Sequence, residues 1–193
     1  RTTDGGMKWM SQLSGTTKWL RGVSFTDAHN GTVVGDEGTI LRTTNGGTTW
    51  TQQQSGTANI LYAVSFIDAN TGATVGLNGT ILYTTNGGSN WTSQQSGTTA
   101  SLYGVSFTDE NHGTVVGDSG IILHTTDGGV NWTSQISGTA TYLEETFFTD
   151  INTGFAAGWS GTILRTTDGG TNWVGQASGT TDRLWGIYFS DTD

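Results

Sequence analysis

Five short polar side chains stand between a pair of threonines and a pair of glycines, and they are the first candidates for chemistry in this chain. An acidic group in such a loop could serve as a general acid or hold a metal ion. Two of the five are Asn, however, and neither role tolerates that exchange. Asn and Asp both accept hydrogen bonds from backbone N–H groups two residues on, which closes a turn. We therefore predict structural turns at Asp4, Asn45, Asn86, Asp127 and Asp168.

The remaining ionisable residues lack the spacing that catalysis or metal binding requires. Glycoside hydrolysis needs two cooperating carboxylates at a defined separation. Glu144 and Glu145 are adjacent, and adjacent side chains on a strand point to opposite faces, so we do not expect them to form that pair. The three His residues lack metal-ligand spacing, and the chain has no Cys. We predict no catalytic residue, no cofactor and no metal site.

Charge and hydropathy narrow the possible partners. The 193 residues include 16 acidic and 7 basic side chains, and the net charge of -9 argues against a nucleic-acid-binding surface. No apolar run approaches the ~18 residues of a membrane-spanning helix. We therefore expect no nucleic acid partner and no membrane insertion.

The polar turns recur because the chain is built from one repeat. The sequence Thr-Thr-Asp/Asn-Gly-Gly begins at every 41st residue from Thr2 to Thr166, without an insertion. A Trp, a Leu and a Phe keep the same step. They are Trp9, Trp50, Trp91, Trp132 and Trp173; Leu20, Leu61, Leu102, Leu143 and Leu184; and Phe25, Phe66, Phe107, Phe148 and Phe189. A fixed period of this length is typical of solenoids and propellers.

Each repeat is predicted to contain four short strands. Leu61–Phe66 alternates large and small side chains with the period of two that marks a strand. The second strand covers Gly72–Gly76, the third covers Thr80–Tyr83, and the fourth leaves the polar turn through Trp91. Asn-Gly and Asp-Gly supply the positive φ that tight hairpins need. One such sheet cannot bury its faces alone, so neighbouring sheets must stack.

The stacked sheets predict an all-β fold, a β-propeller of four-stranded antiparallel blades. A parallel β-helix is the alternative, although its coils are usually shorter and lack regular hairpins. We assign one domain to residues 1–193, with repeat units 1–41, 42–82, 83–123, 124–164 and a partial unit 165–193. This makes about five blades, either as a ring that closes imperfectly or as a segment of a larger propeller.

The repeat also resembles a known family. The motif Thr-Thr-Asp-Gly-Gly-x-x-Trp resembles the Asp-box, or bacterial neuraminidase, repeat. The longer pattern that runs from Val-Ser-Phe-x-Asp through Val-Gly-x-x-Gly-x-Ile-Leu to this motif resembles the propeller repeat of the photosystem II assembly-factor-like proteins. The resemblance covers essentially the whole chain and implies a non-catalytic propeller used for protein contacts. Members of that family typically have more blades than this chain holds.

The recurring tryptophans could stack sugars, but a residue present in every blade is better explained as its hydrophobic anchor. A buried Trp removes up to ~250 Å² of surface from water, which a chain poor in Leu needs. We therefore predict a core position for Trp9, Trp50, Trp91, Trp132 and Trp173.

Residues that differ between repeats are the better candidates for binding. The position after the recurring Leu holds Arg21, Tyr62, Tyr103, Glu144 and Trp185 in turn, and Tyr, Trp and Arg are enriched at binding hot spots. Packing between blades is the alternative role for that position. Trp159 stands in a predicted loop where other repeats have Asp36, Leu77 and Asp118. Arg1, Arg42 and Arg165 share one repeat position and could form a basic arc.

Together these features indicate a non-catalytic scaffold that mediates protein–protein interaction or assembly, its partner being another protein or a second copy of the chain. The few Lys, the lack of Cys and the abundant Thr, Ser, Asn and Gly favour an extracytoplasmic location. One alternative is a glycan-binding module, lectin-like or sialidase-like. A second alternative is a structural repeat of a large surface adhesin or filament.

Overall fold

The 41-residue repeat folds into four-stranded antiparallel sheets. In the computed structural model, which describes residues 1–189, one sheet consists of β5 (Leu61–Phe66), β6 (Gly72–Gly76), β7 (Ile81–Thr84) and β8 (Thr92–Gln94), in chain order. The same order recurs in β1 (Leu20–Phe25), β2 (Gly31–Gly35), β3 (Ile40–Thr43) and β4 (Thr51–Gln53); in β9 (Leu102–Phe107), β10 (Gly113–Gly117), β11 (Ile122–Thr125) and β12 (Thr133–Gln135); and in β13 (Leu143–Phe148), β14 (Gly154–Gly158), β15 (Ile163–Thr166) and β16 (Val174–Gln176). The predicted β-propeller fold is confirmed.

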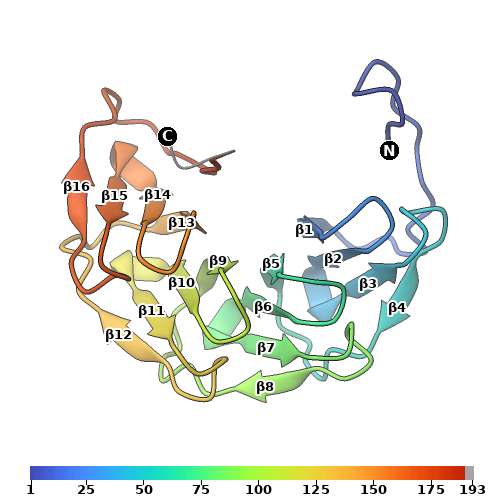
Figure 1. Cartoon of the computed structure of the whole chain (residues 1–193), viewed down its shortest axis with the longest axis horizontal. Helices are drawn as coiled ribbons and strands as arrows, with labels where there is room; N and C mark the ends of the chain where they lie inside the picture. The colour runs from blue at the N-terminus through green and yellow to red at the C-terminus, as the bar shows by residue number, and fades with distance from the viewer. Residues whose placement is uncertain (190–193) are drawn as a thin grey trace.

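The four sheets stand side by side in an arc, as the blades of a propeller do. Figure 1 shows β1, β5, β9 and β13 along the inner side of the arc and β4, β8, β12 and β16 along the outer side. A 3-10 turn joins the second strand of each blade to the third: η1 (Asp36–Gly38), η2 (Leu77–Gly79), η3 (Asp118–Gly120) and η4 (Trp159–Gly161). The N-terminus and strand β16 lie toward opposite ends of the arc (Figure 1).

The described residues account for four complete blades of the predicted number, which is about five with a partial unit. Residues 1–19 and 177–189 of the described part contain no strand. Arg1 and Met10 still exchange two backbone hydrogen bonds of 2.8 Å, which is the pairing expected of the third and fourth strands of a repeat. The last residues of the partial unit 165–193 lie outside the described range.

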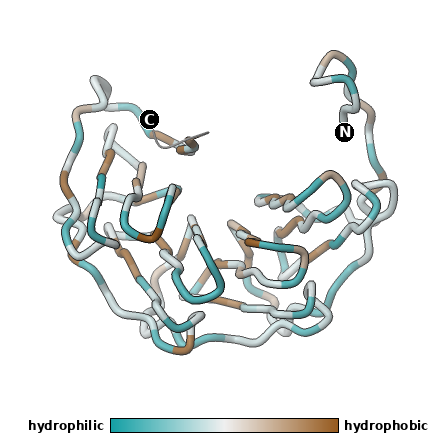
Figure 2. The backbone as a smooth tube through the Cα atoms, in the orientation of Figure 1, coloured by the Kyte–Doolittle hydropathy of each residue, from teal (hydrophilic) through white to brown (hydrophobic). Residues whose placement is uncertain are grey.

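Apolar side chains from two neighbouring blades form each layer of the core. One cluster joins Val75 and Ile81 of the second blade to Leu102, Val105 and Phe107 of the third. Figure 2 shows the hydrophobic stretches along the strands and the hydrophilic ones mainly in the loops. Fully burying one such Leu or Ile contributes about 1.5–3 kcal/mol. At the end of the arc, where no blade precedes β1, Val23 is 62% exposed, whereas its equivalent Val105 is 6% exposed.

The recurring Phe packs on a glycine of the adjacent strand. A Cβ atom at Gly72 would lie 2.5 Å from the Phe66 ring, so only glycine fits there. Trp91 meets the same ring edge-on, with centroids 5.9 Å apart. The same arrangement of Phe and Gly recurs at Phe25/Gly31, Phe107/Gly113 and Phe148/Gly154.

A serine links the innermost strands of neighbouring blades. The Oγ of Ser65 accepts a hydrogen bond of 3.2 Å from the backbone N–H of Phe107 in the next blade. Ser24 and Ser106 make the equivalent bonds. In the fourth blade Phe147 stands at the serine position, and its ring contacts Tyr188 with a centroid distance of 5.0 Å.

The polar turns are closed by their own side chains. In the second blade the Oδ1 of Asn86 accepts hydrogen bonds from the Thr84 hydroxyl and from the backbone N–H of Asn90, four residues on and not two as expected. The Thr84 Oγ1 in turn accepts from the N–H of Gly88, whose φ of 80° suits glycine. The structure therefore places Asp4, Asn45, Asn86, Asp127 and Asp168 in equivalent turns with the same bond to the residue four positions on.

The recurring tryptophans lie at the boundaries between blades. Gln53 on β4 donates from Nε2 to the Gly87 carbonyl (2.8 Å) and accepts at Oε1 from the indole N–H of Trp91 (3.2 Å), both in the next blade. Gln135 bridges to Gly169 and Trp173 in the same way. Trp50, Trp91, Trp132 and Trp173 are half-buried, and each ring meets the recurring Phe of its blade edge-on. Trp9 departs from the predicted core position, since it is 72% exposed.

Candidate functional site

The position that follows the recurring Leu, which differs between repeats, borders one cavity on the inner side of the arc. This axial cavity has a volume of about 390 Å³ and lies where the innermost strands begin. Each repeat contributes the residue that follows its recurring Leu: Arg21, Tyr62, Tyr103, Glu144 and Trp185. The first four come from β1, β5, β9 and β13, and Trp185 follows β16. The arc thus brings together side chains that are 41 residues apart in sequence.

A run of aromatic rings begins at the cavity, which Tyr62 and Tyr103 border, and continues from blade to blade beyond it. We call Tyr62, Tyr103, Tyr142 and Trp159 the aromatic belt. Successive rings meet edge-on, with centroid distances of 5.0, 6.4 and 4.9 Å. Trp159, predicted as an exposed aromatic, is 39% exposed and begins η4. Sequence reasoning missed Tyr142, although its repeat position holds Trp19, Ile60, Ser101 and Arg183 in other units and so differs between repeats as the binding criterion requires.

Arginines flank both ends of the aromatic belt. The Arg21 guanidinium lies 5.4 Å from the Tyr62 ring centroid. The Arg183 guanidinium lies 4.8 Å from the Trp159 centroid and 3.3 Å from the Trp185 centroid. Cations are attracted to aromatic faces, so each contact favours a fixed position of the arginine over its ring.

Acidic side chains hold the belt in place. Arg21 pairs with Asp36 of η1, and the Tyr103 hydroxyl donates to Asp118 of η3 at 2.7 Å. Burial and this bond to a carboxylate raise the pKa of Tyr103 well above its usual range, so the phenol keeps its proton. Glu144 is buried, accepts from the Trp159 indole N–H and pairs with Arg183 at 2.8 Å.

Glu145 has fewer partners than the other acids of the cavity. It stands where the other blades have Gly22, Ala63 and Gly104, and it is half-buried. Its carboxylate accepts one hydrogen bond, from the Thr146 backbone N–H at 3.1 Å. Burial, and to a lesser degree the nearby charge of Glu144, raise the pKa of Glu145 to about 7.

The two glutamates border the same cavity, which alternation along a regular strand does not predict. The register between β13 and β14 shifts between Leu143 and Glu145, so a β-bulge interrupts the alternation of side chains. Glu144 is already engaged by Arg183 and Trp159, which leaves Glu145 as the available acid.

A second cavity of about 730 Å³ continues along the inner strands toward their other ends. The linking serines Ser24, Ser65 and Ser106 border it, together with Phe147 and Tyr188. Glu145 borders both cavities and therefore lies between them.

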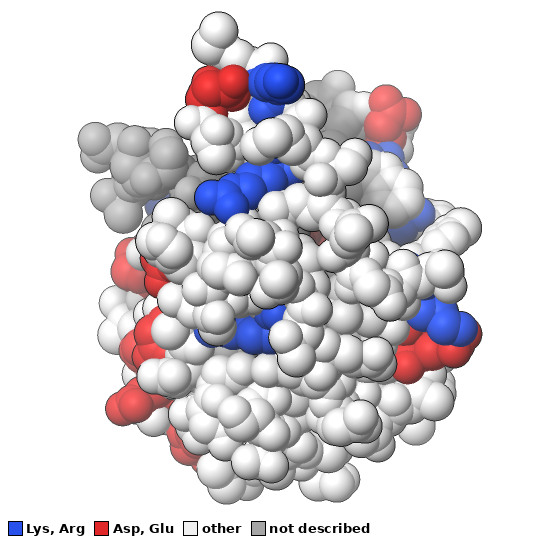
Figure 3. Space-filling model, turned by 90° about the vertical axis from the view of Figure 1, so that its right-hand side faces the viewer, with Lys and Arg blue, Asp and Glu red and all other residues white. Residues whose placement is uncertain are grey.

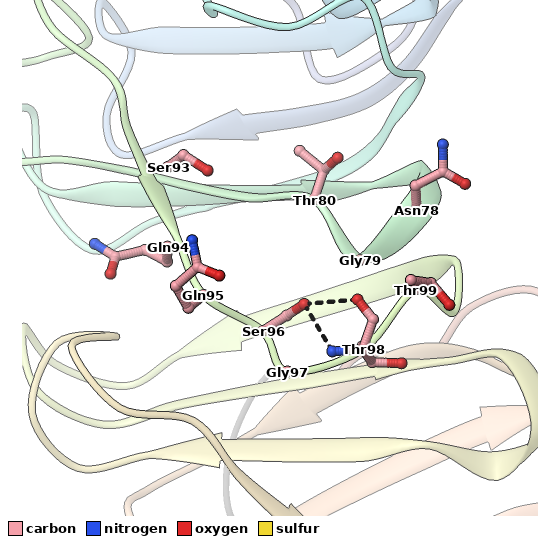
Figure 4. Close-up of a pocket in the computed structure, with 10 residues that line it drawn as sticks. All are labelled: Asn78, Gly79, Thr80, Ser93, Gln94, Gln95, Ser96, Gly97, Thr98 and Thr99. Atoms are coloured by element: carbon pink, nitrogen blue, oxygen red, sulfur yellow. Dashed lines mark hydrogen bonds between the residues drawn. The ribbon is translucent and has the colours of Figure 1, made fainter.

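A third hollow, of about 650 Å³, is a polar groove beside the loop that follows β8 (Figure 4). Ser96 Oγ donates to the Thr98 carbonyl and accepts from the Thr98 N–H, as the dashed lines show (Figure 4). An equivalent groove of about 620 Å³ follows β16. Because the groove recurs and its hydroxyls satisfy the loop itself, we attribute it to loop geometry.

The predicted basic arc is not formed. Arg42 is buried and donates to Thr32 Oγ1 (2.9 Å) and to the Ala69 carbonyl of the next blade (2.6 Å). Arg42 is therefore a bridge between blades, because its repeat position faces the neighbouring sheet. Tyr83, at the same position, also reaches the next blade through its bond to the Glu110 carbonyl. Arg1 and Arg165 are exposed.

Acidic residues cluster in the hairpin loops between the first and second strands, away from the axial cavity. Asp68 accepts hydrogen bonds from the backbone N–H groups of Asn70 (2.6 Å) and Thr71 (2.7 Å), and these bonds lower its pKa. Figure 3 shows acidic groups along one edge of the molecule and basic groups set in the otherwise uncharged surface in the middle of that view. Within residues 1–189 no cluster of three or more His, Asp or Glu side chains could hold a metal ion. In the same range no helix is long and apolar enough to cross a membrane.

Solved structures share this fold at low sequence identity. YCF48 bound to D1 peptide superposes with a TM-score of 0.60 at 19% identity, over 86% of this chain and 82% of that one. An ancestral GH74 enzyme gives 0.67 at 20% identity, over 86% of this chain and 25% of that one. The GH74 xyloglucanase from Xanthomonas campestris gives 0.67 at 13% identity, over 89% and 32%. The chain thus spans a third or less of the length of these GH74 enzymes.

No curated protein sequence matches the chain. A family model does match, and it covers most of the chain: the model for the photosynthesis system II assembly factor YCF48 aligns to residues 1–93, 50–138 and 90–174. Together these three overlapping matches cover residues 1–174. The chain belongs to the family of the photosynthesis system II assembly factor YCF48.

Proposed function

We propose that the chain is a non-catalytic scaffold that binds a segment of another protein at the axial cavity. One observation carries this proposal: the residues that follow the recurring Leu, which differ between otherwise similar repeats, converge on that cavity. In a repeat protein the shared residues build the blade, so specificity must come from the residues that differ. The fold that this chain shares with YCF48 bound to D1 peptide supports a peptide as the kind of ligand.

The chemistry of the cavity suits a protein segment. Tyr62, Tyr103 and Trp185 offer large rigid surfaces, and such residues together with Arg dominate the binding energy of protein interfaces. Trp185 is 68% exposed and free to be covered by a partner. A cavity of about 390 Å³ accepts a few side chains of an extended segment and not a folded domain.

The absence of catalysis is part of the proposal. The GH74 neighbours are enzymes, but a shared fold does not carry an activity with it. Glycoside hydrolysis needs an acid and a second free carboxylate. Of the two glutamates at the cavity, Glu144 is bound by Arg183 and Trp159, which leaves Glu145 alone. The extracytoplasmic location indicated by composition stays a prediction.

Selection from a displayed library of random peptides tests the proposal. Peptides selected on the unmodified chain should bind Trp185→Ala about 10-fold more weakly, since an exposed aromatic at a hot spot is removed without loss of core packing. Ile136→Ala is the control, because Ile136 is 87% exposed and lies outside the cavity. If Trp185→Ala and Ile136→Ala bound the peptides equally well, the axial cavity would not be the binding site.

A glycan array probed with the same variants covers the glycan alternative. We expect no specific glycan to be retained. Specific binding of a sugar that Trp159→Ala abolishes would replace the protein scaffold with a lectin-like function.

A further inference from the structure

The charges around the axial cavity do not cancel. Its two arginines are already neutralised, Arg21 by Asp36 and Arg183 by Glu144. Asp118 is used by the Tyr103 hydroxyl, which is neutral and adds no positive charge. The carboxylate of Glu145 therefore has no cationic partner within residues 1–189.

Glu145 is an addition to the repeat and has no role in building the blade. The equivalent residues Gly22, Ala63 and Gly104 show that the inner strands pack without a side chain of this length. Gly104, in the adjacent strand, lies so close that a Cβ there would be 2.8 Å from the Glu145 Cα. The Glu145 side chain extends from this tight contact to the border between the two axial cavities. A half-buried carboxylate without a counter-ion is costly, and pairing with a cation would offset that cost.

The wall of the cavity is suited to a cation as well. Tyr62 and Tyr103 border it with Glu145, and aromatic faces attract ammonium and guanidinium groups. The ring of Tyr62 already has Arg21 within 5.4 Å, which shows that the belt accommodates a cation at this distance.

We propose that the axial cavity takes the charged end of a Lys or Arg side chain from the bound segment, with Glu145 as its counter-ion and the rings of Tyr62 and Tyr103 as its wall. This inference rests on the proposed function and narrows it to segments that carry a basic residue. The other blades have no acidic residue at the position of Glu145, so the preference for a basic residue arises from the fourth blade alone.

An oriented peptide array tests the inference. Short peptides carry one fixed central residue (Lys, Arg, norleucine, Gln or Glu) between degenerate flanks. The unmodified chain should retain Lys and Arg peptides about 10-fold better than norleucine peptides, the size expected for one desolvated charge pair. Glu145→Gln and Glu145→Ala should bring that ratio close to one. Glu145→Ala gives the fourth blade the residue of the second blade (Ala63), so we expect it to fold.

Glu110→Gln is the matched control. It removes one exposed carboxylate from the hairpin loop between β9 and β10, away from the axial cavity, and changes the net charge equally. The control should keep the preference for Lys and Arg. If it lost that preference as fully as Glu145→Gln, the effect would belong to net charge and the inference would be overturned.

Two further outcomes separate this inference from the proposed function. If norleucine peptides bind as well as Lys peptides while Trp185→Ala still weakens binding, the inferred preference for a basic residue is wrong. The proposal that a peptide binds at the axial cavity is then still supported. If the unmodified chain retains no peptide on the array, both are wrong.

Discussion

The indole N–H of Trp91 donates a hydrogen bond to the side-chain carbonyl of Gln53 across the boundary between two blades, at 3.2 Å. The same Gln53 donates to the Gly87 carbonyl in the polar turn that precedes Trp91. One amide thus holds both the turn and the ring of the following blade. Gln135 and Trp173 repeat this relationship between the third and fourth blades, whereas the buried indole N–H of Trp132 has no hydrogen-bond partner among residues 1–189.

Replacement of Trp91 by Ala should destabilise the protein by about 3 kcal/mol, because the ring fills the space beside Phe66 and a large-to-small change there leaves a cavity. Thermal melting followed by circular dichroism measures the loss. Trp9→Ala is the control, and since Trp9 is exposed we expect a change below about 0.5 kcal/mol. Unchanged melting of Trp91→Ala would mean that the packing between blades described here is wrong.

Replacement of Gln53 by Ala should cost about 1–2 kcal/mol, because the Trp91 N–H and the Gly87 carbonyl both lose a partner. Gln52→Ala alters the adjacent, exposed glutamine and should be neutral. Equal melting temperatures for the two variants would show that the amide bridge adds nothing to stability.

Replacement of Asn86 should separate a structural turn from a chemical site. Asn86→Asp should leave stability unchanged, because other repeats have Asp in the same turn. Asn86→Ala should cost about 1 kcal/mol, since the Asn90 N–H and the Thr84 hydroxyl lose their acceptor. Chemical denaturation of both variants gives the comparison, and a loss as large in Asn86→Asp as in Asn86→Ala would contradict the turn assignment.

Glu145 should make stability fall as pH rises. Its pKa is raised from 4.5 to about 7 in the folded chain, so between these values the folded state binds a proton that the unfolded state has released. The contribution of Glu145 to stability is therefore fully present below about pH 4.5 and is lost as the pH rises to about 7. After allowance for partial exposure the decline is on the order of 1 kcal/mol.

Denaturant unfolding of Glu145→Gln at pH 5 and pH 8 measures that decline. The variant should lose less stability than the unmodified chain over this interval, because its amide does not titrate. Glu110→Gln, the exposed control, should follow the unmodified chain. If Glu145→Gln and the unmodified chain lost the same stability between pH 5 and pH 8, the Glu145 carboxylate would be exposed to water and its pKa would not be raised.

Local sequence determined the repeat and the strands. The strands β5 and β6 have the bounds that the sequence predicts, Leu61–Phe66 and Gly72–Gly76, because alternating side chains and glycine turns act over a few residues. The polar turn was also predictable, since its donors and acceptors lie within four residues of Asn86.

Only the tertiary structure decided what each repeat position contacts. Arg42 and Arg21 are both arginines at repeat positions where some other units have different residues, so the sequence does not distinguish their roles. In the structure Arg42 is buried against the next blade, whereas Arg21 borders the axial cavity. Gln53 and Trp91 are 38 residues apart and meet because the blades stack. The axial cavity likewise exists only because the arc brings five equivalent positions together and a bulge turns Glu144 and Glu145 to one cavity. Contacts of this kind depend on the angle between blades, which no local pattern of residues specifies.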